Sequence, residues 1–194
     1  MLKSWKVFIF TAVLILTSMS GLCLAAMWQP YQFEPKDQEY EYKIITFEED
    51  VEKTSLYVLK MEKKESGQME VSVKTTWVTS QEELDQQILG GWWAAGAFGV
   101  TMAFINPMYA AFFSGLDLYQ GNKMSFFGAG VVEVTGTENV AGRTGFICVF
   151  RNQDVGPILG RYVVDPGVPL PLKTEVYEED GTKQFETELL RIEI

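Results

Sequence analysis

The stretch Met69-Glu70-Val71-Ser72-Val73-Lys74-Thr75-Thr76-Trp77 decides the fold class of this chain. Its odd positions carry methionine, valine, threonine or tryptophan, and its even positions carry polar or charged residues. Side chains alternate between the two faces of a strand, so this pattern predicts a strand with one apolar face and one polar face that is exposed to solvent. Such a strand is typical of an antiparallel sheet that meets water on one side.

Strand patterns of the same kind occur on both sides of this stretch. Before it, Tyr40 to Thr46 alternate with charged or mixed neighbours, and 56–64 is rich in residues that favour strands. After residue 120 the expected strands are 123–127, 130–135, 143–151, 159–164, 172–178 and 183–192. Asp180-Gly181 is a strong hairpin signal between the last two. The sequence therefore predicts one β-rich domain, residues 37–194, built on an antiparallel sheet.

The strand pattern is interrupted between about residues 81 and 116. Ser80 and Glu83 have the spacing of a capping box at the start of a helix. No charged residue occurs in 86–116, and Pro107 pushes Asn106 out of helical geometry. We therefore expect a helix over about 81–105 and a shorter one over about 107–115. The fold class is then α+β, mainly β, with a two-helix apolar insertion covering one face of the sheet.

Three interpretations of the insertion are possible: a membrane span, part of the ordinary core, or a lid over an apolar ligand. Small residues recur every four positions from Gly91 to Ala103, which allows another backbone to approach closely. A membrane span is disfavoured, because it would put the strands before residue 79 and after residue 120 on opposite sides of the bilayer. The insertion is otherwise ordinary core or a lid over an apolar guest. The candidate contacts of such a guest are large and apolar: Trp77, Trp92, Trp93, Phe98, Met102, Phe112 and Phe113.

Residues 1–26 have the features of a secretory signal peptide. Lys3 and Lys6 precede the uncharged stretch 7–26, which has a short apolar centre and ends in small residues. The stretch is just long enough for a membrane anchor, but its apolar centre has the length typical of a cleaved signal. We expect cleavage near Ala25 or Ala26, a linker over 27–36, and export to the periplasm or cell envelope.

Composition excludes several classes of site. The chain has no histidine, so neither a Ser-His-Asp site nor an imidazole-ligated zinc site can form. Removal of residues 1–26 takes away two lysines and no acidic residue, and the net charge goes from −10 to −12. That charge disfavours binding to nucleic acid and to anionic head groups. Among the residues left, Cys148 is the one cysteine, and its apolar neighbours predict a buried core position.

The acidic clusters 48–50 and 178–180 lie next to predicted turns. Consecutive residues of a strand point to alternate faces, so these carboxylates are expected to be solvated charges rather than a catalytic pair or calcium ligands. We expect no catalytic residue, no metal and no cofactor.

Turn motifs near the C-terminus resemble those of a known family. Glu138–Phe146 contains Ala141-Gly142 and leads into a strand, Tyr162–Pro166 ends a strand in Asp-Pro, Leu170-Pro171 follows, and Asp180-Gly181 turns the last hairpin. In this order they are similar to the bacterial lipoprotein-localisation carrier superfamily, over about 131–192. The resemblance implies a curved, half-barrel-like antiparallel sheet with helices over its concave face, in an envelope protein that holds acyl chains. No binding residue of that family matches the insertion of this chain.

These observations lead to two hypotheses about function. The first is an exported, non-catalytic envelope protein that binds or carries a lipid, an acylated protein or another apolar ligand. The alternative is a structural or interaction module whose insertion, 88–116, docks on a membrane or on a protein partner.

Overall fold

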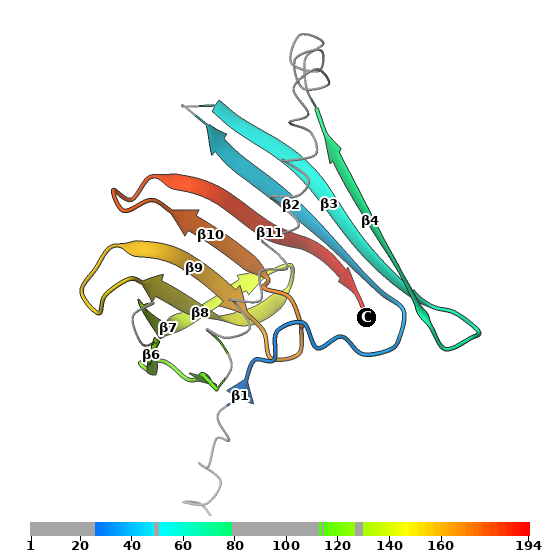
Figure 1. Ribbon diagram of the computed structural model, residues 1–194, viewed down its shortest axis with the longest axis horizontal. Coiled ribbons are helices and arrows are strands. Elements are labelled where there is room, and N and C mark those ends of the chain that lie inside the picture. Colours follow the sequence, from blue (N-terminus) through cyan, green and yellow to red (C-terminus); the bar gives the residue numbers. More distant parts are fainter. Residues whose placement is uncertain (1–25, 49–50, 79–112, 114, 127–129) are drawn as a thin grey trace, which may run out of the picture.

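The computed structural model describes residues 26–48, 51–78, 113, 115–126 and 130–194. Their regular structure consists of eleven strands, and nine of these form one antiparallel sheet in the order β4-β3-β2-β11-β10-β9-β8-β7-β6 (Figure 1). Strands β1 and β5 pair separately. The strands are β1 (Ala26–Met27), β2 (Gln38–Glu48), β3 (Val51–Lys63), β4 (Met69–Trp77), β5 (Asp117–Leu118), β6 (Lys123–Phe126), β7 (Gly130–Val140), β8 (Arg143–Arg151), β9 (Ile158–Val164), β10 (Lys173–Tyr177) and β11 (Lys183–Glu193).

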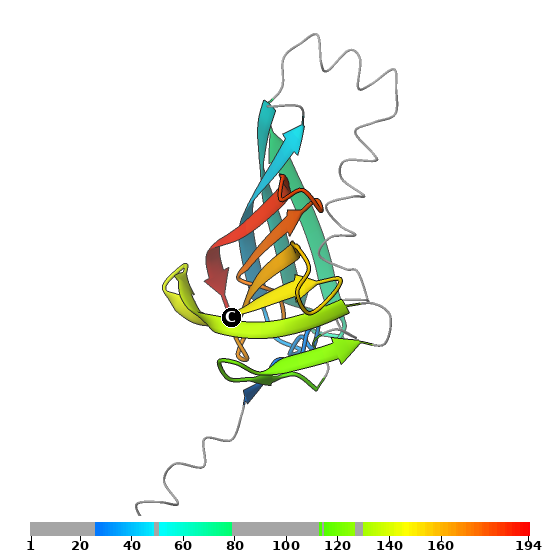
Figure 2. The same ribbon diagram turned by 90° about the vertical axis from the view of Figure 1, so that its left-hand side faces the viewer.

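The sheet consists of two meanders joined by the last strand. Strands β2, β3 and β4 pair in sequence order, and so do β6 to β11. Strand β11 then pairs with β2 as well as β10, which puts the C-terminal strand inside the sheet. The sheet twists strongly, so that β6 and β7 run across the direction of β2 and β3 (Figure 2).

The mainly β, antiparallel and curved architecture expected from the sequence is confirmed, and β4 and β8 have the predicted bounds. The two-helix insertion expected over about 81–116 is not supported, because residues 79–112 and 114 lie outside the described residues and each described element is a strand. Within the part that the structure describes, no helix is long and apolar enough to cross a membrane. The predicted signal peptide, except Ala26, also lies outside the described residues.

One row of directly opposed residues defines the apolar face of the sheet. From β4 to β7 the register places opposite one another Trp77, Ser55, Ile44, Thr187, Thr174, Tyr162, Cys148 and Val134. Directly opposed residues of antiparallel neighbours share a face. The row begins at the exposed Trp77 and is fully buried at Cys148 and Val134, so one face runs from solvent into the core.

The buried side chains form two clusters. The first is centred on β2 and contains Tyr40, Tyr42, Ile44, Tyr57, Met61, Val140, Val163, Val168, Leu170, Leu172 and Leu189. The second lies near β7 and β8 and contains Trp28, Phe113, Leu116, Leu118, Val132, Val134, Cys148, Tyr162 and Val164.

The loop between β9 and β10 holds the two clusters together. The Tyr42 hydroxyl donates a hydrogen bond to the carbonyl of Pro171 (2.8 Å), and the indole N–H of Trp28 donates to the carbonyl of Val168 (2.6 Å). Trp28 belongs to 27–36, the stretch expected to be a linker, and is buried in the second cluster. The Leu-Pro segment of the sequence is therefore a structural connection and not only a turn.

Candidate apolar binding face

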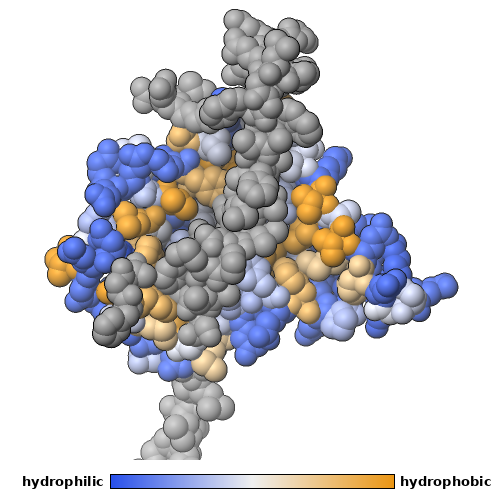
Figure 3. Space-filling view, in the orientation of Figure 1, coloured by the Kyte–Doolittle hydropathy of each residue, from blue (hydrophilic) through white to orange (hydrophobic). Residues whose placement is uncertain are grey.

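The apolar face is open to solvent along β4. Val71 is 58% exposed, Val73 51% and Trp77 43%, although the same face is buried two strands further in, at Tyr42 and Ile44. Because β4 alternates, all of its apolar side chains point to this face. The space-filling view shows one group of apolar residues on the β3–β4 side of the sheet and others on the opposite side of the view (Figure 3). Exposed apolar side chains grouped in this way are typical of a surface that binds a protein, a membrane or an apolar ligand.

Two of the seven candidate contacts lie among the described residues. Trp77 ends β4 on the open part of the face. Phe113 is buried and packs edge-to-face against Trp28 and Tyr162, with ring centroids 5.0 and 5.4 Å apart. Because Tyr162 and Trp77 occupy the same row, these two candidates lie at distant positions along one face. Trp92, Trp93, Phe98, Met102 and Phe112 lie outside the described residues.

Two threonines interrupt the apolar row at its centre. Thr174 of β10 is directly opposite Thr187 of β11, and both are buried. The Thr187 hydroxyl has no hydrogen-bond partner in the described structure. A buried hydroxyl without a partner costs about 1–3 kcal/mol, a cost that an acceptor placed beside it would remove. The sequence pattern alone did not single out this position.

The opposite face carries a ladder of ion pairs across β7 to β11. Glu175 is at its centre and contacts Arg161 (2.9 Å) and Lys183 (2.7 Å). Arg161 also pairs with Glu138, and Lys183 with Glu186 (2.7 Å). Burial alone would raise the pKa of the Glu175 carboxyl, but the hydrogen bonds and charges of Lys183 and Arg161 outweigh it and lower that pKa.

Sequence reasoning missed this ladder, although a signal was present. Lys173 and Glu175, and likewise Glu186 and Glu188, are spaced two apart on neighbouring strands. The polar face is thus built from complementary charges and is distinct in chemistry from the apolar face.

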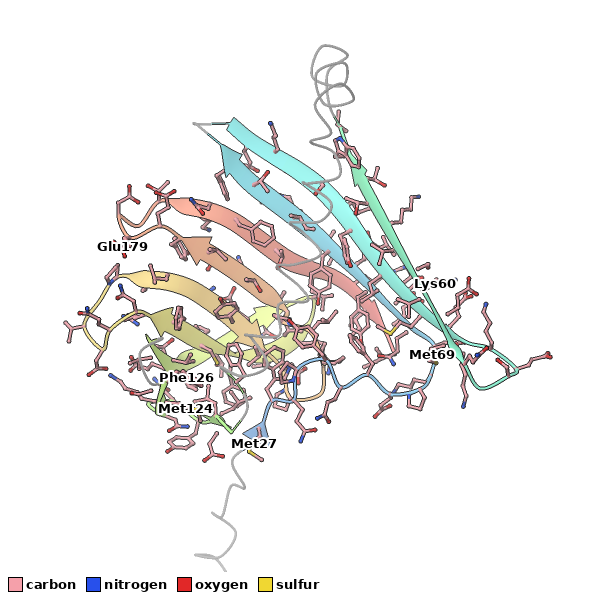
Figure 4. All side chains as sticks on the ribbon, viewed as in Figure 1. Met27, Lys60, Met69, Met124, Phe126 and Glu179 are labelled. Carbon is pink, nitrogen blue, oxygen red and sulfur yellow. The ribbon has the colours of Figure 1, made fainter. Side chains whose placement is uncertain are left out.

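Cys148 and the acidic β10–β11 turn are two further places among the described residues that carry ionisable side chains. Cys148 is fully buried, and this burial raises the pKa of its thiol to about 12, which confirms a core residue rather than a nucleophile. Glu179 lies at the tip of the exposed β10–β11 turn (Figure 4), where the Asp180 carboxylate accepts a hydrogen bond from the Thr182 amide (2.8 Å). The described residues contain no group of three or more acidic or cysteine side chains placed to hold a metal ion.

An open depression of about 590 Å³ lies where the chain enters β2, beside the β3–β4 hairpin. It is lined mostly by charged residues: Pro35, Lys36, Asp37, Lys63, Lys64 and Glu65. It does not include any of the candidate apolar contacts.

Comparisons with known proteins give distant structural matches but no family. No protein-family model matches the chain, and no curated protein matches it. A crystal structure of MucB in complex with MucA(peri) is 13% identical with a TM-score of 0.43, covering 80% of this chain and 49% of that one. The MucA/MucB complex of Pseudomonas aeruginosa is 9% identical with a TM-score of 0.39, covering 82% and 52%. This chain therefore spans about half the length of the MucB structures.

A putative outer membrane lipoprotein-sorting protein domain from Vibrio parahaemolyticus is 10% identical, with a TM-score of 0.25, and covers 82% of this chain and 86% of that one. Its name agrees with the weak resemblance that the turn motifs of the sequence indicate. All these TM-scores are below 0.5, so the proposals that follow rest on the residues of this chain.

Proposed function

We propose that this protein is an exported envelope protein that binds a lipid, an acylated protein or another apolar ligand on the apolar face of its sheet, without catalysis. The observation that carries the proposal is the row that begins exposed at Trp77 and runs into the buried core. Covering the open side chains of β4 would gain about 25 cal/mol for each Å² of apolar surface removed from water. The polar, ion-paired opposite face offers no comparable gain.

Two further features belong to the proposal. The first is export, which is supported by the signal-peptide pattern of residues 1–26. The second is an apolar lid formed by the segment of about 81–116, whose candidate contacts Trp92, Trp93, Phe98, Met102 and Phe112 would add to those of the sheet. The unpaired Thr187 hydroxyl gives the ligand side of the sheet one hydrogen-bond donor, which suits an ester or amide carbonyl next to an acyl chain.

Uptake of a fluorescent fatty acid by the purified full chain tests the proposal. We expect saturable binding by the wild type and roughly tenfold weaker binding by Trp77→Ala, equivalent to about 1.4 kcal/mol of lost apolar contact. Tyr119→Ala is the matched control, because Tyr119 is also an exposed aromatic residue but precedes β6, far along the chain from β4. It should bind like the wild type.

Native mass spectrometry of protein purified from membranes completes the test. A bound lipid or acyl species is expected. If the wild type is found only without ligand and takes up no fatty acid, the proposal is wrong. Carbonate extraction separates it from the alternative of a membrane-docked module, since a carrier is released to the soluble fraction and an inserted module stays with the membrane.

A further inference from the structure

Strand β4 is an open edge of the nine-stranded sheet. It pairs with β3 on one side, and in the described structure no strand lies on its other side (Figure 1). The strand is nine residues long and begins at Met69, next to the β3–β4 hairpin (Figure 4). A long edge with exposed apolar side chains is a template for pairing with another strand.

The hairpin fixes which backbone groups face outwards. The Lys64 amide donates to the Gln68 carbonyl (2.8 Å), which makes these two residues a hydrogen-bonded pair. Hydrogen-bonded and non-hydrogen-bonded pairs alternate along an antiparallel ladder. The register from Lys63–Met69 to Ser55–Trp77 has no shift, so residues 69, 71, 73, 75 and 77 direct their N–H and C=O groups away from β3. The same five residues carry the side chains of the apolar face.

We propose that this edge pairs with β4 of a second copy of the chain, antiparallel, about a two-fold axis at Val73. Val73 is the middle residue of β4 and one of the outward-facing residues, so the two copies of Val73 would exchange both of their hydrogen bonds. Shifting the axis to Val71 or Thr75 would leave part of the strand unpaired. A closed two-fold contact of this kind uses the same surface on both copies.

The side chains of β4 are complementary to themselves in this register. On the apolar face Val71 would lie opposite Thr75, and Met69 opposite Trp77, a favourable sulfur–aromatic pair. On the polar face Ser72 would lie opposite Lys74, so no like charges are directly opposed. Glu70 and Lys74 of the two copies would be diagonal neighbours, within reach of an ion pair.

The self-complementary side chains and charges of β4 therefore favour a second copy of the chain as the partner of this edge. Glu70 already pairs with Lys64 of its own hairpin, and the Lys74 of a second copy would add a second positive partner. The apolar faces of two sheets would become continuous across the axis, and the exposed surfaces of Val71, Val73 and Trp77 would be reduced. This inference goes beyond ligand binding and does not depend on it.

Sedimentation velocity of the full chain, with and without a charge at residue 73, tests the inference. We expect the wild type to be a dimer. Val73→Lys and Val73→Glu should each be monomers, because either would place like charges opposite each other at the axis. An equal mixture of the two variants should restore the dimer, since Lys would then face Glu.

Val155→Lys is the matched control, because Val155 is 96% exposed and lies between β8 and β9. It adds the same charge away from the edge and should leave the dimer intact. Circular dichroism and urea unfolding check that each variant is folded, which is expected because residue 73 is half exposed.

Several results would overturn the inference. These are a monomeric wild type, a dimeric Val73→Lys variant, or a mixture that stays monomeric although each variant is folded. A different protein that purifies with the wild type and is lost from Val73→Lys would assign the edge to another chain, and would equally overturn pairing between copies.

Discussion

Cys148 and Tyr40 are ionisable groups that the fold keeps neutral. Both side chains have no exposed surface. Burial raises the pKa of the Cys148 thiol to about 12, and it raises the pKa of the Tyr40 phenol to about 12 against the partial opposing effect of the Arg143 charge. Their charged forms are therefore more favourable in the unfolded chain than in the folded one.

Because the pKa values of these two groups are higher in the folded chain than in the unfolded chain, the folded state loses stability at alkaline pH. The contribution of each group is complete below its unfolded pKa, about 9 for the thiol and about 10 for the phenol, and is lost as the pH rises towards 12. We expect the free energy of unfolding, measured in urea, to fall from about pH 9 upwards. In Cys148→Ala the fall should begin about one pH unit later. A free energy that does not change between pH 8 and 11.5 would contradict this explanation.

At the residue scale, local pattern predicts some buried positions and not others. The core position of Cys148 follows from its neighbours Phe146 to Phe150, which are apolar on both sides. Trp28 lies in a proline-containing segment without periodicity, and its burial depends on a carbonyl 140 residues away, that of Val168. The sequence contains no local signal for such a contact.

At the element scale, β4 and β8 were predicted best, β4 from its alternation and β8 from its apolar run. Strand β4 alternates along its whole length, and its bounds agree with the pattern. Strands β2 and β3 are longer than predicted, because polar residues such as Glu52 and Lys53 pair with Phe47 and Thr46 across the ladder. Pairing with a neighbour, rather than intrinsic preference, keeps these residues extended.

The ion-pair ladder is also a property of elements, because its members come from different strands. Glu175→Gln removes the carboxylate that Arg161 and Lys183 share. We expect a loss of about 1–3 kcal/mol in the free energy of unfolding at neutral pH, since two partly buried cations lose their common partner. Chemical denaturation measures the change.

The pH dependence of this stability loss tests whether the ionised carboxylate of Glu175 is its cause. A lowered carboxyl pKa contributes stability above its unfolded value, 4.5, and that contribution is lost as the pH falls through the folded value. The difference between the wild type and Glu175→Gln should therefore shrink in acid. Glu179→Gln, in the exposed turn, should stay within about 0.5 kcal/mol of the wild type at neutral pH. If Glu175→Gln and Glu179→Gln lowered the free energy of unfolding equally, the ion-pair ladder would not be the source of the stability.

At the scale of the whole molecule, a single antiparallel sheet follows from the sequence, but the order of its strands does not. Neighbours in sequence pair with each other, as turn signals such as Asp180-Gly181 predict. The pairing of β11 with β2 joins residues far apart in the chain, for example Phe185 with Thr46. Nothing in the local pattern of either strand specifies that partner. Trp77 and Tyr162 likewise share one row of the sheet through register, which a single strand pattern cannot show.

Deleting residues 183–194 tests how far the sheet depends on this strand. The deletion removes the ladder to both β2 and β10 and the buried Leu189. We expect loss of the cooperative unfolding transition in urea, followed by circular dichroism. Deleting Ile194 alone, a half-exposed residue beyond β11, should leave the transition unchanged. A shortened chain that still unfolds cooperatively would show that the two meanders are independently stable.

The central place of β11 also has a consequence for the order of events during synthesis. The meander β2–β4 and the meander β6–β10 can each form from local hairpins as they leave the ribosome. Among the described strands, β11 is the one that joins them by ladder hydrogen bonds. Contacts between distant parts of a chain form slowly, because a large loop must close first. The sheet is therefore complete only after residues 183–193 of β11 have been made.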